Sequence, residues 1–381
     1  MSSGATIPYQ LRPNKAVDRE LFLALLVRLG SAVDLRKFKY VGLGGPFLAD
    51  FRLLHARTGI TNMDCIEMEE DAHLRQEFNK PFPSIICLHK TLDEYLSETE
   101  FTQPVILWMD YTQPKDLPAQ IESFAQQFLA LPLGSVLRLT VNASPSSLGE
   151  PKDKNENVRE WRLKKFKERM PEYHSASIVS DDMSPQRYGQ CVLRAVQLAV
   201  DKRMLEAKDR EVCWALATTY ADGQGMATAT LLILKRQDRE VNAETPSSGR
   251  PQAPVQAAEP VETATSMETA KPVAVAEPGT PLTQGEASLP GEAAKRVPWP
   301  KAGDPGLRDL IRGWEFFSEP AAPLVLDMPN LSTLERLTME AHDDPRSRMD
   351  FDLPRSEIGQ DPILAFKKFY RVFPHFTRVE L

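Results

Sequence analysis

Three glycines and one acid are placed where the backbone of an α/β sheet could meet a nucleotide-like ligand. Gly42, Gly44 and Gly45 come directly after an apolar run that begins at Phe38. Glycine has no Cβ, so the backbone can approach a ligand closely and can adopt positive φ. Glu67 lies about twenty residues further on, the spacing at which a carboxylate meets ribose hydroxyls. These residues predict a binding site for a nucleotide-like ligand, although glycines after a strand can also form a simple turn.

A second polar segment follows another apolar run and could supply a base. It begins at Asp110 and Tyr111 and continues through Thr112, Gln113 and Pro114. A carboxylate at a strand end can remove a proton from a substrate hydroxyl, or it can cap the helix that follows. Asp93 is placed where an adenine would lie, with a surface-helix position as the alternative. We expect Asp110 and Tyr111 to be catalytic and Asp93 to contact the ligand.

Two further polar segments have two interpretations each. Asn14 and Lys15 precede an apolar helix, and they could fold over the ligand or form a capped helix start. The segment 152–169, from Lys152 to Arg169, is rich in Lys and Arg with Trp161 interleaved. Such a pattern could contact nucleic acid, or it could form a solvated helix. We retain nucleic acid as a possible partner through this segment.

The elements that must position these residues alternate between strand-like and helix-like patterns, which is typical of a parallel α/β sheet. Two strand-like runs after residue 211 are joined by a segment that contains Asp222-Gly223, a hairpin signal. The sheet should therefore end in an antiparallel pair. The expected strands are 38–42, 63–68, 84–88, 105–109, 135–141, 212–220 and 226–234, and the expected helices start near 16, 47, 71, 118 and 184.

The chain divides into three blocks by composition. Residues 1–236 carry the α/β pattern and are expected to form the catalytic domain. Residues 237–298 are rich in Ala, Pro, Glu, Thr and Ser, and they hold too little apolar surface to offset chain entropy, so we expect a disordered linker. Residues 299–381 regain aromatic side chains, among them Trp314 and Phe369. This C-terminal module should dock on the catalytic domain, with a protein partner as the alternative.

The layout resembles the class I S-adenosylmethionine-dependent methyltransferases, whose Rossmann-like sheet of seven strands ends in an antiparallel hairpin. The resemblance covers about residues 10–236. It implies that Gly42, Gly44 and Gly45 contact the methionine part of S-adenosylmethionine, that Glu67 binds its ribose, and that Asp110 faces the methyl group. More narrowly, the start Tyr9-Gln10-Leu11-Arg12-Pro13-Asn14-Lys15 is similar to that of a bacterial group of putative O-methyltransferases.

Two departures from the family pattern bear on the ligand and the acceptor. Pro46 replaces a third glycine, and the loop from Asp110 to Pro114 is not the Asp/Asn-Pro-Pro-aromatic motif of amino-group DNA methyltransferases. The glycine that a dinucleotide site requires would fall at Phe47, which disfavours an NAD-dependent oxidoreductase. We expect methyl transfer to an unidentified acceptor, with oxygen slightly favoured over nitrogen. The alternative is a methyltransferase-like module that binds or assembles without catalysis.

Composition sets the remaining expectations. The formal net charge of -7 disfavours a protein that coats nucleic acid non-specifically. Four cysteines are widely spaced without metal-ligand spacing, so we expect no metal site, and reduced buried thiols at Cys65 and Cys87. No apolar run reaches the roughly 20 residues that span a bilayer, and the start lacks signal-peptide order, so no membrane association and a cytoplasmic protein are expected.

Overall fold

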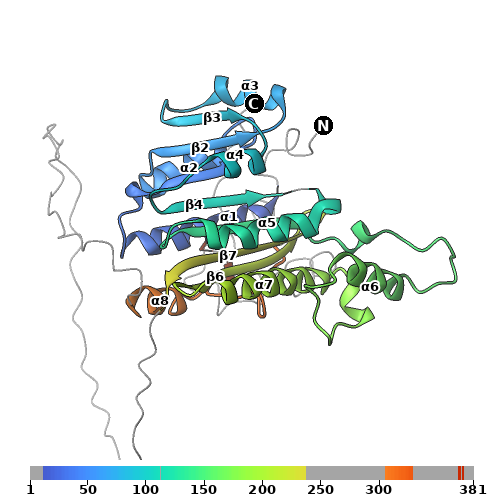
Figure 1. Ribbon diagram of the computed structural model, residues 1–381. Helices are drawn as coiled ribbons and strands as arrows, with labels where there is room; N and C mark the ends of the chain where they lie inside the picture. Colours follow the sequence, from blue (N-terminus) through green and yellow to red (C-terminus); the bar gives the residue numbers. More distant parts are fainter. Residues whose placement is uncertain (1–11, 112, 237–304, 329–367, 370, 373–381) are drawn as a thin grey trace, which may run out of the picture. The chain divides into compact units, whose positions relative to one another are not determined.

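The computed structural model describes residues 12–111, 113–236, 305–328, 368–369 and 371–372. These residues form an eight-stranded sheet in the order β3-β2-β1-β4-β5-β7-β6-β8 (Figure 1). The predicted seven strands are confirmed, and the last two of them form the predicted antiparallel pair. Tyr9 to Leu11, the expected linker at 237–298 and most of the residues 299–381 lie outside the described residues.

The strands follow the apolar runs of the sequence closely. They are β1 (Lys39–Leu43), β2 (Asn62–Glu67), β3 (Ile85–His89), β4 (Val105–Asp110), β5 (Val136–Asn142), β6 (Arg210–Ala221), β7 (Gly225–Lys235) and β8 (Leu324–Leu326). The first five pair in parallel, whereas β7 runs antiparallel to both β5 and β6. All residues of β5 are buried, as expected for a strand covered on both faces.

Helices cover both faces of the sheet. The α-helices are α1 (Pro13–Gly30), α2 (Ala49–Thr58), α3 (Glu70–Asn79), α4 (Leu92–Glu98), α5 (Leu117–Ala130), α6 (Val158–Arg169), α7 (Tyr188–Glu206) and α8 (Pro305–Arg312). Buried side chains of α1, α2 and α8 share one apolar core with the sheet. Those of α4, α5, α6 and α7 share the core on the other face. Figure 1 shows α5 and α7 in front of the strands and α1 behind them.

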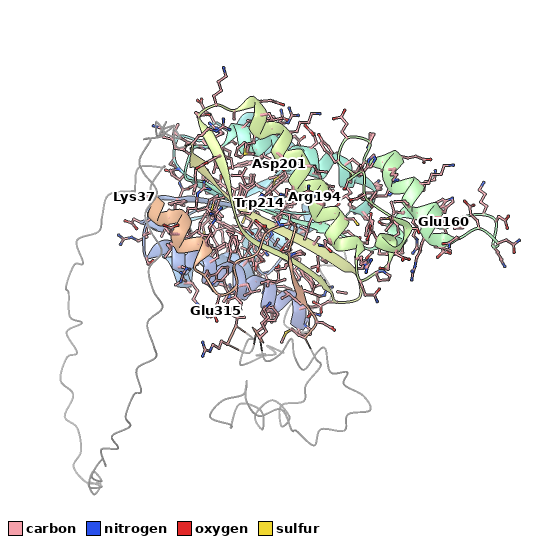
Figure 2. All side chains as sticks on the ribbon, turned by 90° about the horizontal axis from the view of Figure 1, so that it is seen from below. Lys37, Glu160, Arg194, Asp201, Trp214 and Glu315 are labelled. Atoms are coloured by element: carbon pink, nitrogen blue, oxygen red, sulfur yellow. The ribbon has the colours of Figure 1, made fainter. Side chains whose placement is uncertain are left out.

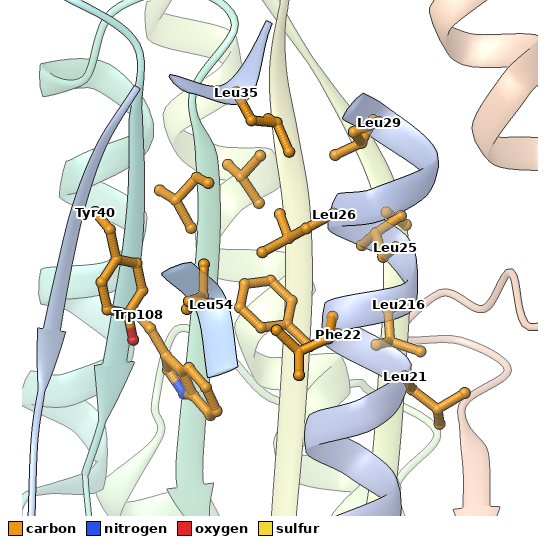
Figure 3. Packing of buried hydrophobic residues seen from close by; sticks show 14 of the residues in the cluster. Leu21, Phe22, Leu25, Leu26, Leu29, Leu35, Tyr40, Leu54, Trp108 and Leu216 are labelled. Carbon is orange, nitrogen blue, oxygen red and sulfur yellow. The ribbon is translucent and has the colours of Figure 1, made fainter. Parts of the chain in front are cut away.

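The core beneath α1 is closely packed. Figure 3 shows Phe22, Leu26 and Leu29 of α1 facing the sheet, with Tyr40 and Trp108 on neighbouring strands. The rings of Phe22 and Trp108 meet edge to face, with their centroids 5.2 Å apart. The buried leucines recur at spacings of three and four residues, which places them on one side of the helix. The helix is therefore held at a defined position against the sheet, with Lys15 in its first turn beside Asp110 at the end of β4.

Residues 305–328 pack on the first block and extend its sheet. Strand β8 pairs in parallel with β6 through Thr218, Thr219 and Tyr220. Helix α8 packs on α1, where the Arg28 Nε donates to the Leu310 carbonyl at 2.7 Å. The sequence analysis did not predict this eighth strand. An apolar run of three residues does not indicate which strand of the sheet it will pair with.

Two helices begin later than the sequence predicts. Helix α2 begins at Ala49 instead of near Phe47, because Leu48 adopts φ 51° and ends an extended loop. Helix α7 begins at Tyr188, because Ser184 first accepts hydrogen bonds from Arg187 and Tyr188 in a turn. Both differences lengthen a loop at the carboxyl end of the sheet, where ligands of such folds bind.

Candidate methyl-transfer site

The predicted glycine turn requires glycine for packing reasons at two positions. A Cβ on Gly42 would lie 2.6 Å from the Tyr40 hydroxyl oxygen, which occupies the space above it. A Cβ on Gly44 would lie 2.5 Å from the Cys65 sulfur and 2.9 Å from a methyl carbon of Leu48. Neither position has room for a side chain. Gly42 lies within β1 and Gly44 follows it, so the end of the strand and the turn after it are closely packed against their neighbours.

Two amide side chains of α3 fix the outward carbonyls of this turn. The Gln76 Nε2 donates to the Gly44 carbonyl, and Gln76 is fully buried. One helical turn later, the Asn79 Nδ2 donates to the Pro46 carbonyl at 2.9 Å. Pro46 therefore belongs to the anchored loop that precedes α2, instead of starting the helix. Phe47 is 57% exposed and its ring faces Arg75.

Glu67 ends β2, as predicted, beside the glycine turn. Its Oε1 accepts a hydrogen bond from the Glu69 amide at 2.9 Å. Partial burial raises the pKa of the Glu67 carboxyl, although the hydrogen bond from Glu69 works in the opposite direction. Its register partner on β3 is His89, whose ring stacks on that of His73 at 5.4 Å. A half-buried carboxylate at this position can accept hydrogen bonds from vicinal hydroxyls.

Asp110 ends β4 and faces α1. The Lys15 ammonium lies 3.5 Å from its Oδ2, and the two side chains are 13% and 16% exposed. Its other oxygen, Oδ1, is buried and has no hydrogen-bond partner among the described residues. One helical turn along α1, Arg19 forms a second ion pair with Asp50 in the first turn of α2. Two ion pairs from α1 thus flank the glycine turn.

Asn14, in contrast, is engaged in holding the backbone. Its Nδ2 donates to Asp222 at 2.9 Å and to the Ala221 carbonyl at 3.0 Å, and its Oδ1 accepts from the Met328 amide at 2.6 Å. Asp222 also accepts the Lys15 amide at 2.8 Å. Asp222 therefore caps the start of α1 from the β6–β7 turn. A role of Asn14 in cofactor binding stays a prediction.

Asp93 and Tyr111 lie on the other face of the sheet from Lys15. Asp93 is exposed on α4 and accepts a hydrogen bond from the Ser123 hydroxyl at 3.4 Å. Burial raises the pKa of Tyr111 to about 12, so its phenol remains protonated at neutral pH. The Tyr111 amide donates to the Thr140 carbonyl of β5 at 2.8 Å, which fixes the start of the loop after β4. Thr112 lies outside the described residues.

A buried ion pair anchors α1 to the sheet beneath these groups. Arg138 of β5 is fully buried and donates to Asp18 of α1 at 2.6 Å. Asp18 also accepts from Thr218 at 2.6 Å, so one carboxylate ties α1 to two strands. The Arg138 guanidinium lies against both the Phe22 and the Trp108 ring, at 4.6 and 4.9 Å from their centroids. This arrangement fixes the face of α1 that presents Lys15 and Arg19.

The basic segment 152–169 forms an exposed loop and helix α6. Figure 2 labels Glu160 on this helix, at the opposite end of the side-chain view from Lys37. Three of its cations have acidic partners: Arg159 pairs with Asp181, Arg162 with Glu150, and Lys165 with Glu168. Surface pairs of this kind contribute little to stability, but they reduce the positive charge that a phosphate would meet. The contacts therefore favour the solvated-helix interpretation.

A cavity of about 350 Å³ lies away from the glycine turn. It is lined by residues of α6 and α7, of the loop between them, and of the segment before β8, among them Phe166, Cys191 and Ala321. The cavity lies near β8, at one edge of the sheet. The glycine turn follows β1, and the strands β4, β5, β7 and β6 separate β1 from β8 in the sheet order, so we assign the cavity no part in the site. Within the described ranges there is no cluster of three metal-ligating side chains. Nor do those ranges contain a helix long and apolar enough to cross a membrane.

Several residues of the site were missed by the sequence analysis. They are Arg19, Tyr40, Asp50, Gln76, Asn79 and Asp222. Their partners are set by the fold and lie far away in the sequence, as with Asp222 and Lys15. Only Arg19 carried a visible signal, because it follows Lys15 by four residues and so shares its face of α1.

Solved structures match the chain at low sequence identity. They include a putative O-methyltransferase from Klebsiella pneumoniae, with 12% identity, 60% of this chain and 90% of that chain covered, and a TM-score of 0.32. An O-methyltransferase from Bacillus cereus in complex with SAH has 15% identity, coverage of 60% and 94%, and a TM-score of 0.30. Trm1 from Pyrococcus horikoshii with S-adenosyl-L-methionine has 12% identity, coverage of 60% and 57%, and a TM-score of 0.39.

The search of curated protein sequences found no match. The family model described as putative O-methyltransferase matches residues 7–251 and 306–381, on both sides of the intervening segment. This match covers most of the chain and includes the C-terminal residues that complete the sheet. The predicted resemblance to methyltransferases is confirmed: the chain belongs to the putative O-methyltransferase family.

Proposed function

We propose that the protein transfers the methyl group of S-adenosylmethionine to an oxygen atom of its acceptor. Family membership supports methyl transfer. The observation that favours a hydroxyl acceptor is the carboxylate of Asp110. Its Oδ2 pairs with Lys15, and its Oδ1 is buried without a hydrogen-bond partner among the described residues. A free carboxylate oxygen in this position can accept the proton that a hydroxyl must lose.

The proposed reaction is an in-line displacement. The acceptor oxygen would attack the methyl carbon, the carbon–sulfur bond would break, and the Asp110 carboxylate would accept the hydroxyl proton. The products are a methyl ether, or an ester if the acceptor is a carboxyl group, and S-adenosylhomocysteine. The sulfonium supplies the reactivity, so the protein mainly aligns the two reactants and excludes water. Lys15 keeps Asp110 oriented, and Glu67 holds the ribose.

Transfer of a labelled methyl group to fractionated lysate tests this proposal. We expect label in a base-stable ether or a base-labile ester, and its loss in Asp110→Ala. Label in an amine would overturn the choice of oxygen. Label in nucleic acid would identify nucleic acid as the acceptor class. Tight cofactor binding without transfer to any fraction would favour the non-catalytic binding or assembly module, whose partner should then require residues 299–381.

A further inference from the structure

Two cysteines lie opposite each other on neighbouring strands. Cys65 of β2 and Cys87 of β3 are register partners, and both are free thiols. Register partners on neighbouring strands lie about 4.8 Å apart, within the range of about 4.4–6.8 Å that the Cα atoms of disulfide-bonded cysteines span. They also point to the same face of the sheet. The backbone therefore holds the two sulfurs within reach of each other, and β3, at the edge of the described sheet, can adjust to a new bond.

The two thiols have different surroundings. Cys65 is fully buried, and burial together with the hydrogen bond that its thiol donates to Cys87 raises its pKa well above the usual value. The same hydrogen bond lowers the pKa of Cys87, although partial burial opposes it. Cys87 is 8% exposed. Because the thiolate is the nucleophile in cysteine chemistry, Cys87 is the more reactive sulfur and Cys65 is the thiol that can react with it afterwards.

Cys65 also contacts the glycine turn. Its sulfur lies 2.5 Å from the position that a Cβ on Gly44 would take, and the Gly44 amide donates a hydrogen bond to it. Gln76 holds the carbonyl of the same glycine. The Cys65 sulfur is therefore one of two side-chain partners that fix the Gly44 backbone, and a change in its position alters the packing of the turn.

We propose that Cys65 and Cys87 are a redox-active pair that hydrogen peroxide converts to a disulfide, and that this bond releases Gly44. The Cys87 thiolate attacks the peroxide, the oxygen–oxygen bond breaks, hydroxide leaves, and Cys87 becomes a sulfenic acid. The Cys65 thiol then attacks the Cys87 sulfur and loses its proton, and water leaves. In total, two thiols are oxidised by two electrons and one peroxide is reduced to two water molecules. A dithiol reductant reverses the reaction by exchange.

The bond has a consequence for the turn. It draws the Cys65 sulfur toward Cys87, so the Gly44 amide loses its hydrogen-bond acceptor and the turn is held less firmly. Affinity for the cofactor should then fall until the pair is reduced. This second part of the proposal rests on the proposed function, because it supposes that the turn binds S-adenosylmethionine, whereas formation of the disulfide does not depend on it.

Peptide mapping of the full chain under non-reducing conditions tests the disulfide. Trypsin cleaves after Arg75, so Cys65 and Cys87 fall in separate peptides that only a disulfide joins. After hydrogen peroxide we expect a linked peptide, lighter by two hydrogen atoms than the sum of its parts, and its loss on reduction. In Cys65→Ala, dimedone should trap a sulfenic acid at Cys87. In Cys87→Ala, Cys65 should stay a thiol. Absence of the linked peptide from the wild type would overturn the proposal.

The matched control is Cys191→Ala. Cys191 lies on α7, where burial raises the pKa of its thiol to about 12 and its sulfur donates to the Asp182 carbonyl at 3.7 Å. This variant should form the linked peptide as the wild type does. If removal of Cys191 abolishes the link, the pairing of Cys65 with Cys87 is wrong.

Calorimetry with S-adenosylhomocysteine tests the effect on the turn. Oxidation of the wild type should lower its affinity roughly tenfold, the effect of losing a buried hydrogen bond. Peroxide should change the affinity of Cys87→Ala less than about twofold, because one hydrogen bond to Gly44 is then retained. A linked peptide with unchanged affinity would overturn the release of Gly44 alone. If the reduced wild type does not bind this ligand, the proposed function fails together with the effect on the turn, while the peptide map still decides the disulfide.

Discussion

The Lys15 ammonium and the Asp110 carboxylate meet 3.5 Å apart, across the gap between the first helix and the end of the fourth strand. The two side chains are 13% and 16% exposed, whereas the Asp110 Oδ1 is buried. The contact joins a residue from the start of the chain to the loop that follows β4. The ion pair with Lys15 holds the Asp110 carboxylate in a fixed orientation, in which it can accept a proton.

Replacing this carboxylate should affect chemistry more than binding. In Asp110→Asn we expect kcat to fall by about 10²–10⁴, the usual contribution of a general base. The dissociation constant of S-adenosylhomocysteine should change less than about threefold. Steady-state kinetics with the identified acceptor, combined with calorimetry, measure both. Asp116→Asn, an exposed acid of the same loop, is the control and should leave kcat unchanged. A variant Asp110→Asn with full kcat would exclude Asp110 as the base.

Gly44→Ala should weaken cofactor binding and lower stability. The added Cβ would lie 2.5 Å from the Cys65 sulfur and 2.9 Å from Leu48, so the turn must move or the strands must open. Overpacking of this kind costs about 1–3 kcal/mol. Chemical denaturation measures the stability, and calorimetry measures the binding. Gly30→Ala is the control, because its Cβ would meet Leu35 at an ordinary 3.4 Å. Equal behaviour of the two variants would contradict the packing account of the turn.

Cofactor affinity should depend on pH through Glu67. Ribose hydroxyls donate to the ionised carboxylate, and burial raises the pKa of Glu67. Binding should therefore weaken as pH falls through this raised pKa, at a higher pH than for an ordinary glutamate. The free energy of unfolding depends on pH in the opposite direction. The raised pKa of Glu67 favours the folded state when the carboxyl is protonated, so this contribution to stability is lost as pH rises.

Calorimetry across pH 4–8 should show the decline in the wild type and its absence in Glu67→Gln. The variant should bind weakly at every pH. Glu94→Gln is a useful comparison, because the hydrogen bonds from Thr91 lower the pKa of Glu94, and it lies on the exposed surface of α4. An unchanged pH profile in Glu67→Gln would assign the dependence to another group.

The segment between β7 and α8 should be replaceable without loss of stability. Arg308 of α8 forms an ion pair with Glu211, and Glu211 is the register partner of Leu234 near the end of β7. The two attachment points are therefore close, and a short Gly/Ser bridge of roughly ten residues can replace residues 238–295. The thermal midpoint should change by less than about 2 °C.

Removing residues 238–381 is the contrasting experiment. It deletes the apolar side chains of α8 and β8, among them Ile311 and Leu326, which are 0% and 2% exposed. The uncovered surface should make the shortened protein insoluble or cause it to unfold at a much lower temperature. If the bridged protein proves as unstable as this truncation, the intervening segment has a structural role.

The sequence was most informative where a pattern is local. The strand runs, the Asp222-Gly223 hairpin signal and Glu67 at the end of β2 could all be predicted, because each follows from alternation or from a turn preference. Contacts between distant residues could not. Nothing near Asn14 indicates that Asp222 and Met328 bind it, and nothing near Gly44 indicates that Gln76 holds its carbonyl. Those partners are brought together only by the completed fold.

The junction of Asn14 with Asp222 and Met328 has a consequence for the time at which α1 can complete its contacts. A ribosome delivers Asn14 first, and Met328, whose amide donates to the Asn14 Oδ1, follows 314 positions later. Until then the start of α1 is held by the β6–β7 turn alone, through Asp222 and the Ala221 carbonyl. The helix that presents Lys15 therefore receives its full set of contacts only once synthesis has passed residue 328.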